Sequence, residues 1–200
     1  AAVQAMSRLG LLRDMDGAGV YVGFTAGVLG DNQLEAERLV AGMFPLAPEE
    51  QGLVIKAIIY SGLPDRLALL QGVAERMPAR RKLVDAYLTG KEPGLMQLPL
   101  DSGPAAIDTL WGFYFATGAY QPVERLVQAL AWSADKKDVN RLTIASMAKW
   151  TLAQNASRDK ALLELRRVEA AHQPKGVAGP LKEVVSAAEN YETAKIRKEA

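Results

Sequence analysis

Hydrophobic residues recur along this chain in helical segments separated by short turns. Each turn contains a glycine or asparagine that can end one helix, with Asp, Pro or Ser residues nearby that can begin another. After each turn, a pair of large apolar residues falls at a similar distance, so each second helix should bury one face. The pattern predicts antiparallel helical hairpins. The turns centre on Gly30, Gly62, Gly118 and Asn155, and the apolar pairs begin at Leu39, Leu69, Leu126 and Leu162.

A further helix end is expected at Gly90, which divides the interval between Gly62 and Gly118 into two equal steps. The segment 91–103 that follows contains two prolines and two glycines, too many for a full helix. We expect a long ordered loop there. The chain is predicted to form a single helical-repeat domain over residues 1–200, with the 91–103 loop as an alternative boundary between two halves.

Prolines mark predicted helix starts at Pro48, Pro122 and Pro180. The segment after Pro180 is apolar on one face and mixed in charge on the other. We therefore expect a C-terminal capping helix, polar outside and apolar inside, as helical arrays require. Its apolar positions are Leu181, Val184, Val185, Ala188 and Tyr191.

One turn resembles a known repeat family. The turn Gly118-Ala119-Tyr120, followed by Val123 and Leu126, is similar to the Gly-Asp-Tyr turn and second-helix start of tetratricopeptide repeats. Pro45 and Pro78 stand where that family's closing proline follows the second helix. The resemblance implies an all-α fold of stacked antiparallel hairpins forming an α–α superhelix. Sel1-like and other degenerate helical repeats are open alternatives.

Composition and charge narrow the functional classes. The chain is 49% hydrophobic and 24% charged, which is ordinary for a globular protein and argues against disorder. Its 24 basic and 23 acidic residues leave a net charge of +1, which gives no broad field to attract nucleic acid or an anionic membrane. With no cysteine, disulfides and Cys-based metal sites are excluded. The uncharged runs 17–30 and 109–123 are shorter than the roughly 18 residues of a membrane span and predict buried core helices.

The sequence begins at Ala1 without an initiator methionine. This fits a trimmed chain or a mature protein whose signal peptide has been removed. We favour a periplasmic or exported location, with a cytoplasmic location as the alternative.

Local motifs offer little catalytic chemistry. The run 17–23 contains glycines arranged almost as in a dinucleotide fingerprint, but their spacing is wrong and no strand precedes them, so it predicts a close helix crossing. His172 is the only histidine, and its Glu-x-x-His spacing from Glu169 lacks the second copy that a di-iron site needs. We expect His172 at a helix end. The basic group from Arg76 to Lys82 indicates an acidic partner surface as a further alternative.

The most distinctive stretch is Leu110-Trp111-Gly112-Phe113-Tyr114-Phe115. On a helix it is apolar nearly all round, so it predicts a central core helix. The sharper alternative places Trp111 or Tyr114 on a concave surface as an anchor for a bound peptide, with Trp150 extending that surface.

These patterns predict a non-enzymatic scaffold that binds a protein or peptide segment on a concave helical surface, where first helices line a groove and second helices support it. We expect no catalytic residue, cofactor or metal, no nucleic-acid partner and no transmembrane segment. Two alternatives stay open: a structural subunit of a bacterial envelope or secretion assembly, and an enzyme that uses carboxylates the sequence does not locate. The oligomeric state is undetermined at this level.

Overall fold

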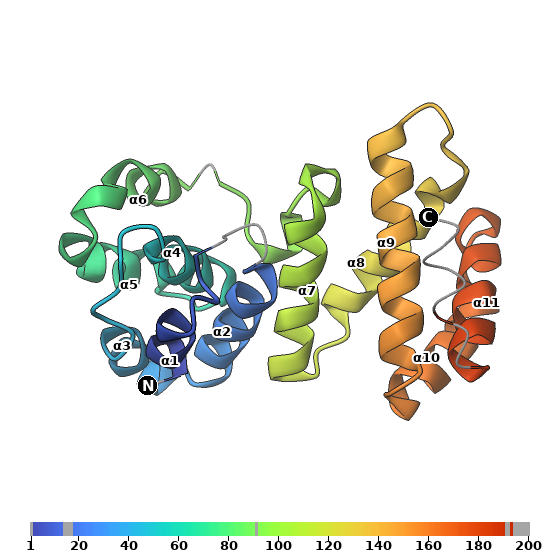
Figure 1. Ribbon diagram of the computed structural model, residues 1–200, viewed down its shortest axis with the longest axis horizontal. Coiled ribbons are helices and arrows are strands. Elements are labelled where there is room, and N and C mark those ends of the chain that lie inside the picture. The colour runs from blue at the N-terminus through green and yellow to red at the C-terminus, as the bar shows by residue number, and fades with distance from the viewer. Residues whose placement is uncertain (1, 14–17, 91, 191–192, 194–200) are drawn as a thin grey trace. The chain divides into compact units, whose positions relative to one another are not determined.

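The computed structural model describes residues 2–13, 18–90, 92–190 and 193, and throughout these ranges the regular elements are helices and none is a strand (Figure 1). The predicted all-α class is confirmed. Two compact units are present: unit 1 comprises Ala1–Pro99 and Ala105–Pro122, and unit 2 comprises Leu100–Pro104 and Val123–Ala200. The division therefore does not follow the 91–103 loop as a whole, because the last residues of that loop belong to unit 2.

Unit 1 is built around one buried helix. Helix α4 (Gln51–Tyr60) is buried at every residue except Lys56, as expected for a helix that is apolar all round. Helices α2 and α5 both pack on α4, α6 packs on α5, and α3 packs on α2. The other helices of this unit are α1 (Ala2–Arg8), α2 (Gly19–Asp31), α3 (Ala36–Ala41), α5 (Arg66–Val73), α6 (Arg81–Leu88) and α7 (Pro104–Thr117, in unit 1 from Ala105).

Helices α2 and α7 cross with their backbones in contact. A Cβ atom at Gly19 or Gly27 would lie less than 3 Å from an atom of α7, and one at Gly112 of α7 would lie 2.1 Å from the carbonyl oxygen of Val20. Glycine is required here because any side chain would separate the helices. The predicted close crossing is confirmed for the described residues, and Gly17 lies outside them.

Three of the predicted turns have the expected glycine conformation. Gly62, Gly90 and Gly118 have φ angles of +75°, +69° and +68°, in the left-handed region that favours glycine. The predicted helix ends near Gly30 and Asn155 are confirmed, since α2 and α9 end one residue later, at Asp31 and Ala156. The left-handed conformation predicted for these two residues is wrong, because both have helical backbone. Gly30 serves packing, since a Cβ there would lie 2.5 Å from the carbonyl oxygen of Ser61, and the side chain of Asn155 donates to the carbonyl of the preceding helical turn.

Unit 2 contains α8 (Gln121–Ala129, whose first two residues are in unit 1), α9 (Val139–Ala156), α10 (Lys160–Ala170) and α11 (Lys175–Glu189). Helix α9 packs on α10, on α11 and on the 3₁₀ segment Leu130–Ala134. Asp138 and Asp159 cap α9 and α10, because each side chain accepts a hydrogen bond from a backbone N–H in the first turn.

The C-terminal helix begins earlier than predicted. Helix α11 starts at Lys175, and Pro180 lies inside it. The apolar stripe explains the extension, since buried Val177 precedes Leu181 by one helical turn on the same face. Leu181, Val184 and Ala188 are buried as predicted, and Tyr191 lies outside the described residues.

The segment 92–103 is an ordered loop, as predicted, with 3₁₀ turns at Leu95–Gln97 and Leu100–Ser102; Lys91 lies outside the described residues. The buried runs in α2 and α7 confirm the predicted core helices. No helix in the described ranges combines the length and apolar character needed to cross a membrane.

Candidate binding groove

An open groove of about 670 Å³ lies between α3 and α5 in unit 1. Each wall rests on a different helix, since α3 packs on α2 and α5 packs on α4. The N-terminal part of the first wall is the 3₁₀ turn Gln33–Glu35, and the C-terminal part of the second is the 3₁₀ turn Ala74–Arg76.

Each wall presents residues at helical spacing. Positions separated by three or four residues share one helix face, so the lining residues of each wall form one continuous face turned toward the groove. Small residues keep the groove open: Ala41, Ala68 and Gly72 line it, and a Cβ at Gly72 would meet no heavy atom within 4 Å. The two faces are Leu34, Glu37, Arg38 and Ala41 on the first wall, and Asp65, Ala68, Leu69, Gly72, Val73 and Arg76 on the second.

The groove has an apolar floor and one fully exposed apolar residue at its rim. Ala36, Leu69 and Val73 are buried and form the floor. Leu34 is 100% exposed, so its side chain contributes no burial to the fold. A leucine at the edge of an open groove is positioned to be covered by an occupant, which would gain about 2 kcal/mol from its burial.

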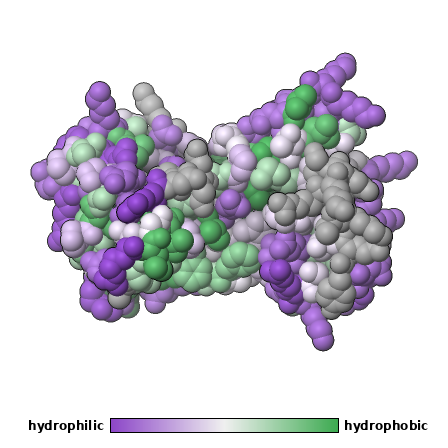
Figure 2. All heavy atoms as spheres, viewed as in Figure 1, coloured by the Kyte–Doolittle hydropathy of each residue, from purple (hydrophilic) through white to green (hydrophobic). Residues whose placement is uncertain are grey.

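Unit 1 also exposes other large apolar side chains. Leu9 is 74% exposed, and Leu11, Phe24 and Phe115 are exposed as well. On the face shown in Figure 2, hydrophobic surface gathers around α1 and α2 between hydrophilic residues. Apolar exposure on unit 1 is therefore not confined to the groove, but at the groove it coincides with a concave surface.

The charged residues that line the groove differ in whether another side chain neutralises their charge. Arg38 Nε lies 2.5 Å from Glu35 Oε2, so this cation is neutralised by its neighbour. Arg76 places its guanidinium 5.5 Å from the ring centroid of Phe44 and donates to the carbonyl oxygen of Ala41 at 3.5 Å. Glu37 and Asp65 have no ion pair with any residue in the described ranges.

The predicted aromatic anchors lie elsewhere. Trp111 is 3% and Tyr114 is 9% exposed, with their rings edge to face at 5.7 Å, so α7 is the core helix that its apolar sequence predicts, and these two rings do not lie on an open surface as the alternative required. The indole Nε1–H of Trp111 has no acceptor among the described residues. The exposed ring of this stretch is Phe115, which stacks on Trp111. Trp150 is half-buried on α9 and belongs to unit 2.

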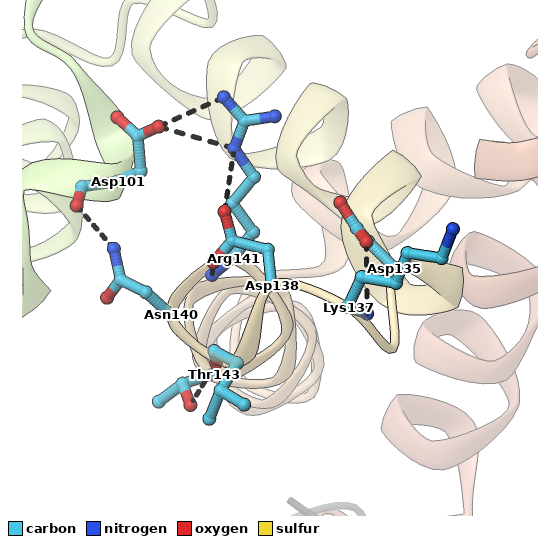
Figure 3. Close-up of polar contacts among 8 residues, drawn as sticks. Asp101, Asp135, Lys137, Asp138, Asn140, Arg141 and Thr143 are labelled. Atoms are coloured by element: carbon cyan, nitrogen blue, oxygen red, sulfur yellow. Dashed lines mark hydrogen bonds and ion pairs between the residues drawn. The ribbon is translucent and has the colours of Figure 1, made fainter.

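A polar cluster in unit 2 holds the end of the loop to α9 (Figure 3). Arg141 Nε and Nη2 donate to the Asp101 Oδ2 atom at 3.3 and 3.2 Å, and Asn140 Nδ2 donates to the Asp101 carbonyl at 2.7 Å. The Arg141 guanidinium also lies 5.2 Å from the Trp132 ring centroid, and its Nε lies 3.7 Å from Asp138 Oδ2. This cluster explains why residues 100–104 belong to unit 2. Arg141 pairs with both Asp101 and Asp138 within the fold, so we interpret the cluster as structural.

Two carboxyl groups have raised pKa values. Burial raises the pKa of Asp108 on α7. Burial also raises the pKa of Glu169 on α10 and outweighs the opposing attraction of Arg166. These carboxyls belong to different units, so neither unit brings the two together.

The other candidates have local partners. The Nδ1 atom of His172 lies 2.9 Å from the carbonyl oxygen of Val168, at the end of α10, as expected for a residue that meets free helix carbonyls. The described residues hold no group of three or more His, Asp or Glu side chains arranged for a metal ion. Within the basic group, Arg80 donates to the Pro48 carbonyl and Arg81 pairs with Asp85.

The sequence reasoning missed the groove residues because it placed the binding surface on the first helices of the hairpins. The groove instead lies between second helices. The signal was the recurrence of small residues, Ala41, Ala68 and Gly72, on helices that were expected to be buried supports. Their significance depends on which helices are neighbours, and the spacing of the turns does not determine that.

Comparisons with protein-family models, with curated proteins and with solved structures found no match for this chain.

Proposed function

We propose that this protein is a non-enzymatic interaction module made of stacked, tetratricopeptide-like helical hairpins, and that it binds a short helical segment of a partner protein in the groove between α3 and α5. The observation that carries the proposal is the pair of facing helix surfaces that line an open groove, with Leu34 fully exposed at the rim. Helix-in-groove recognition uses such surfaces, with apolar anchors of the bound helix spaced at three and four residues.

The size of the groove suits such an occupant. The lining residues of the second wall run from Asp65 to Arg76, which at 1.5 Å per residue corresponds to roughly 16 Å. That length matches about three turns of a bound helix.

A helical occupant is favoured over an extended one by hydrogen bonding. Both walls are helices, whose backbone N–H and C=O groups mostly bond within the helix. An extended peptide would find few backbone partners here and would leave its own polar groups unsatisfied when buried. A helix satisfies its backbone internally and needs only side-chain contacts.

The proposal can be tested with a displayed library of helix-forming peptides of about 15 residues, selected on the purified protein. We expect binders whose affinity falls at least tenfold for Gly72→Trp, which fills the groove. Gly176→Trp is the matched control, because Gly176 is also a helical glycine with no heavy atom within 4 Å of an added Cβ, and it lies in unit 2. Thermal unfolding of both variants checks that they fold. A selection that yields no binders, or binders that Gly72→Trp retains, would contradict the proposal.

A further inference from the structure

We infer that the α3–α5 groove selects the charge pattern and the direction of its occupant. The occupant is a partner helix with an acidic residue in its first turn and a basic residue in its last turn, and it runs antiparallel to α3 and α5. This inference rests on the proposed function and adds to it the class of segment that the groove accepts.

The two walls run in the same direction. Arg76, just after α5, donates to the carbonyl of Ala41, the last residue of α3, and its guanidinium lies over the ring of Phe44. The C-terminal ends of both helices therefore meet at one end of the groove. Glu37 is in the first turn of α3 and Asp65 immediately precedes α5, so both carboxylates lie toward the other end.

The ends of the groove consequently differ in charge. At the end of the groove formed by the N-terminal ends of α3 and α5, Arg38 forms an ion pair with Glu35. Glu37 and Asp65 therefore have no ion pair among the described residues. Arg66, next to Asp65, donates to the carbonyl of Leu63 and does not line the groove. At the C-terminal end, Arg76 is the charged lining residue, and its contacts with an aromatic ring and a carbonyl leave its charge unneutralised.

Complementary charges on the occupant must therefore be basic beside Glu37 and Asp65 and acidic beside Arg76. An isolated helix is stabilised by acidic residues in its first turn and basic residues in its last turn, because these oppose the helix dipole. Both requirements are met together only when the C-terminal end of the occupant lies beside Glu37 and Asp65. This orientation also sets the dipole of the occupant against the parallel dipoles of α3 and α5.

The inferred segment has a simple form. It is an amphipathic helix of about three turns, with apolar residues at three- and four-residue spacing that contact Leu34, Leu69 and Val73. An acidic residue precedes this apolar stripe, and a basic residue follows the acidic one by about ten positions.

The test uses two synthetic peptides of identical composition, stapled so that their helicities match by circular dichroism. One carries Glu in the first turn and Lys in the last, and the other exchanges these two residues. We expect the first to bind wild-type protein about tenfold more tightly at low salt, with the difference shrinking as salt rises from about 50 to about 500 mM. The double variant Glu37→Gln, Asp65→Asn should reduce the preference to less than about twofold, and adding Arg76→Glu should reverse it. Glu49→Gln is the control, because Glu49 is an exposed acid that does not line the groove, and this variant should keep the wild-type preference for the first peptide.

The outcomes separate this inference from the proposed function. If both peptides bind equally and both are lost in Gly72→Trp, the groove binds helices without charge selection and only the inference fails. If neither peptide binds but library peptides bind in a Gly72-dependent manner, the inference again fails alone. If no peptide binds in a Gly72-dependent manner, both fail. Self-association in light scattering that Gly72→Trp abolishes would make a second copy of the chain the occupant and would overturn the inference.

Discussion

Gly23 of α2 lies directly against the carbonyl oxygen of Thr109 on α7, so close that a Cβ at Gly23 would come within 1.9 Å of that oxygen. No rotamer change can relieve this contact, because both groups belong to helical backbone. The glycines of α2 therefore make the core of unit 1 possible, and the same residue type on α5 keeps the groove open.

We expect Gly23→Ala to destabilise unit 1 by roughly 3 kcal/mol, because the two helices must move apart to admit one methyl group. The measurement is the urea midpoint followed by circular dichroism. Gly72→Ala is the matched control: it makes the same change on α5 in open space, where alanine should stabilise the helix by up to about 1 kcal/mol. Equal midpoints for Gly23→Ala and wild type would show that the crossing is looser than described.

Helix α10 offers two Arg–Glu pairs at the same spacing in different surroundings. The guanidinium of Arg166 is fully buried with Glu169, whereas Arg167 and Glu164 are exposed. Glu169→Gln should cost about 2 kcal/mol, because it removes one counter-charge from a buried cation, and the partial exposure of Glu169 keeps the loss below that of a fully buried pair. Glu164→Gln should cost less than about 0.5 kcal/mol. Chemical denaturation measures the free energy of unfolding of both variants. Similar losses of stability in the two would contradict the prediction that the buried pair contributes more than the exposed pair.

Asp101→Ala should loosen the end of the loop without unfolding unit 2. The substitution removes both hydrogen bonds from Arg141 and leaves the backbone contact with Asn140. Since Asp101 and Arg141 are partly exposed, we expect a stability loss of at most about 1 kcal/mol. Amide hydrogen exchange should accelerate at residues 100–103. Asp135→Ala is the control. The Asp135 side chain accepts a hydrogen bond from the Lys137 backbone N–H and does not contact residues 100–103 in this cluster, so hydrogen exchange at those residues should stay as in wild type.

Asp108 should make the stability of unit 1 depend on pH. Burial raises its pKa above the usual value of 3.8, so the folded state binds this proton more readily than the unfolded state. The contribution of Asp108 to the free energy of unfolding is therefore fully present below about pH 3.8, and it is lost as the pH rises through the pKa that Asp108 has in the folded protein.

The neutral variant Asp108→Asn should consequently gain stability relative to wild type between about pH 3 and about pH 7, as measured by urea unfolding at each pH. Asp85→Asn provides the contrast, since it removes an exposed ion pair with Arg81 and should lose a little stability at pH 7. A difference between Asp108→Asn and wild type that does not change with pH would contradict the prediction.

The sequence by itself determined the local structure of this protein. Turn glycines such as Gly62, Gly90 and Gly118 were predictable because only glycine readily adopts positive φ. The core helices α2 and α7 were predictable from the two uncharged runs, 17–30 and 109–123. The loop before Gly103 was predictable because proline and glycine oppose helix formation within a few residues. These are short-range effects, so the sequence contains them directly.

Only the tertiary structure decided which helices pack against one another and which of their faces stay open. Gly30 has the signature of a turn glycine, yet it has helical backbone near the end of α2, and its lack of a side chain lets the carbonyl oxygen of Ser61, the residue after α4, approach it closely. The groove exists because α3 and α5 pack on different helices and leave Ala68 and Gly72 facing open space. Contacts between residues far apart in sequence depend on the packing of whole helix faces, and no local pattern of residues specifies which faces will meet.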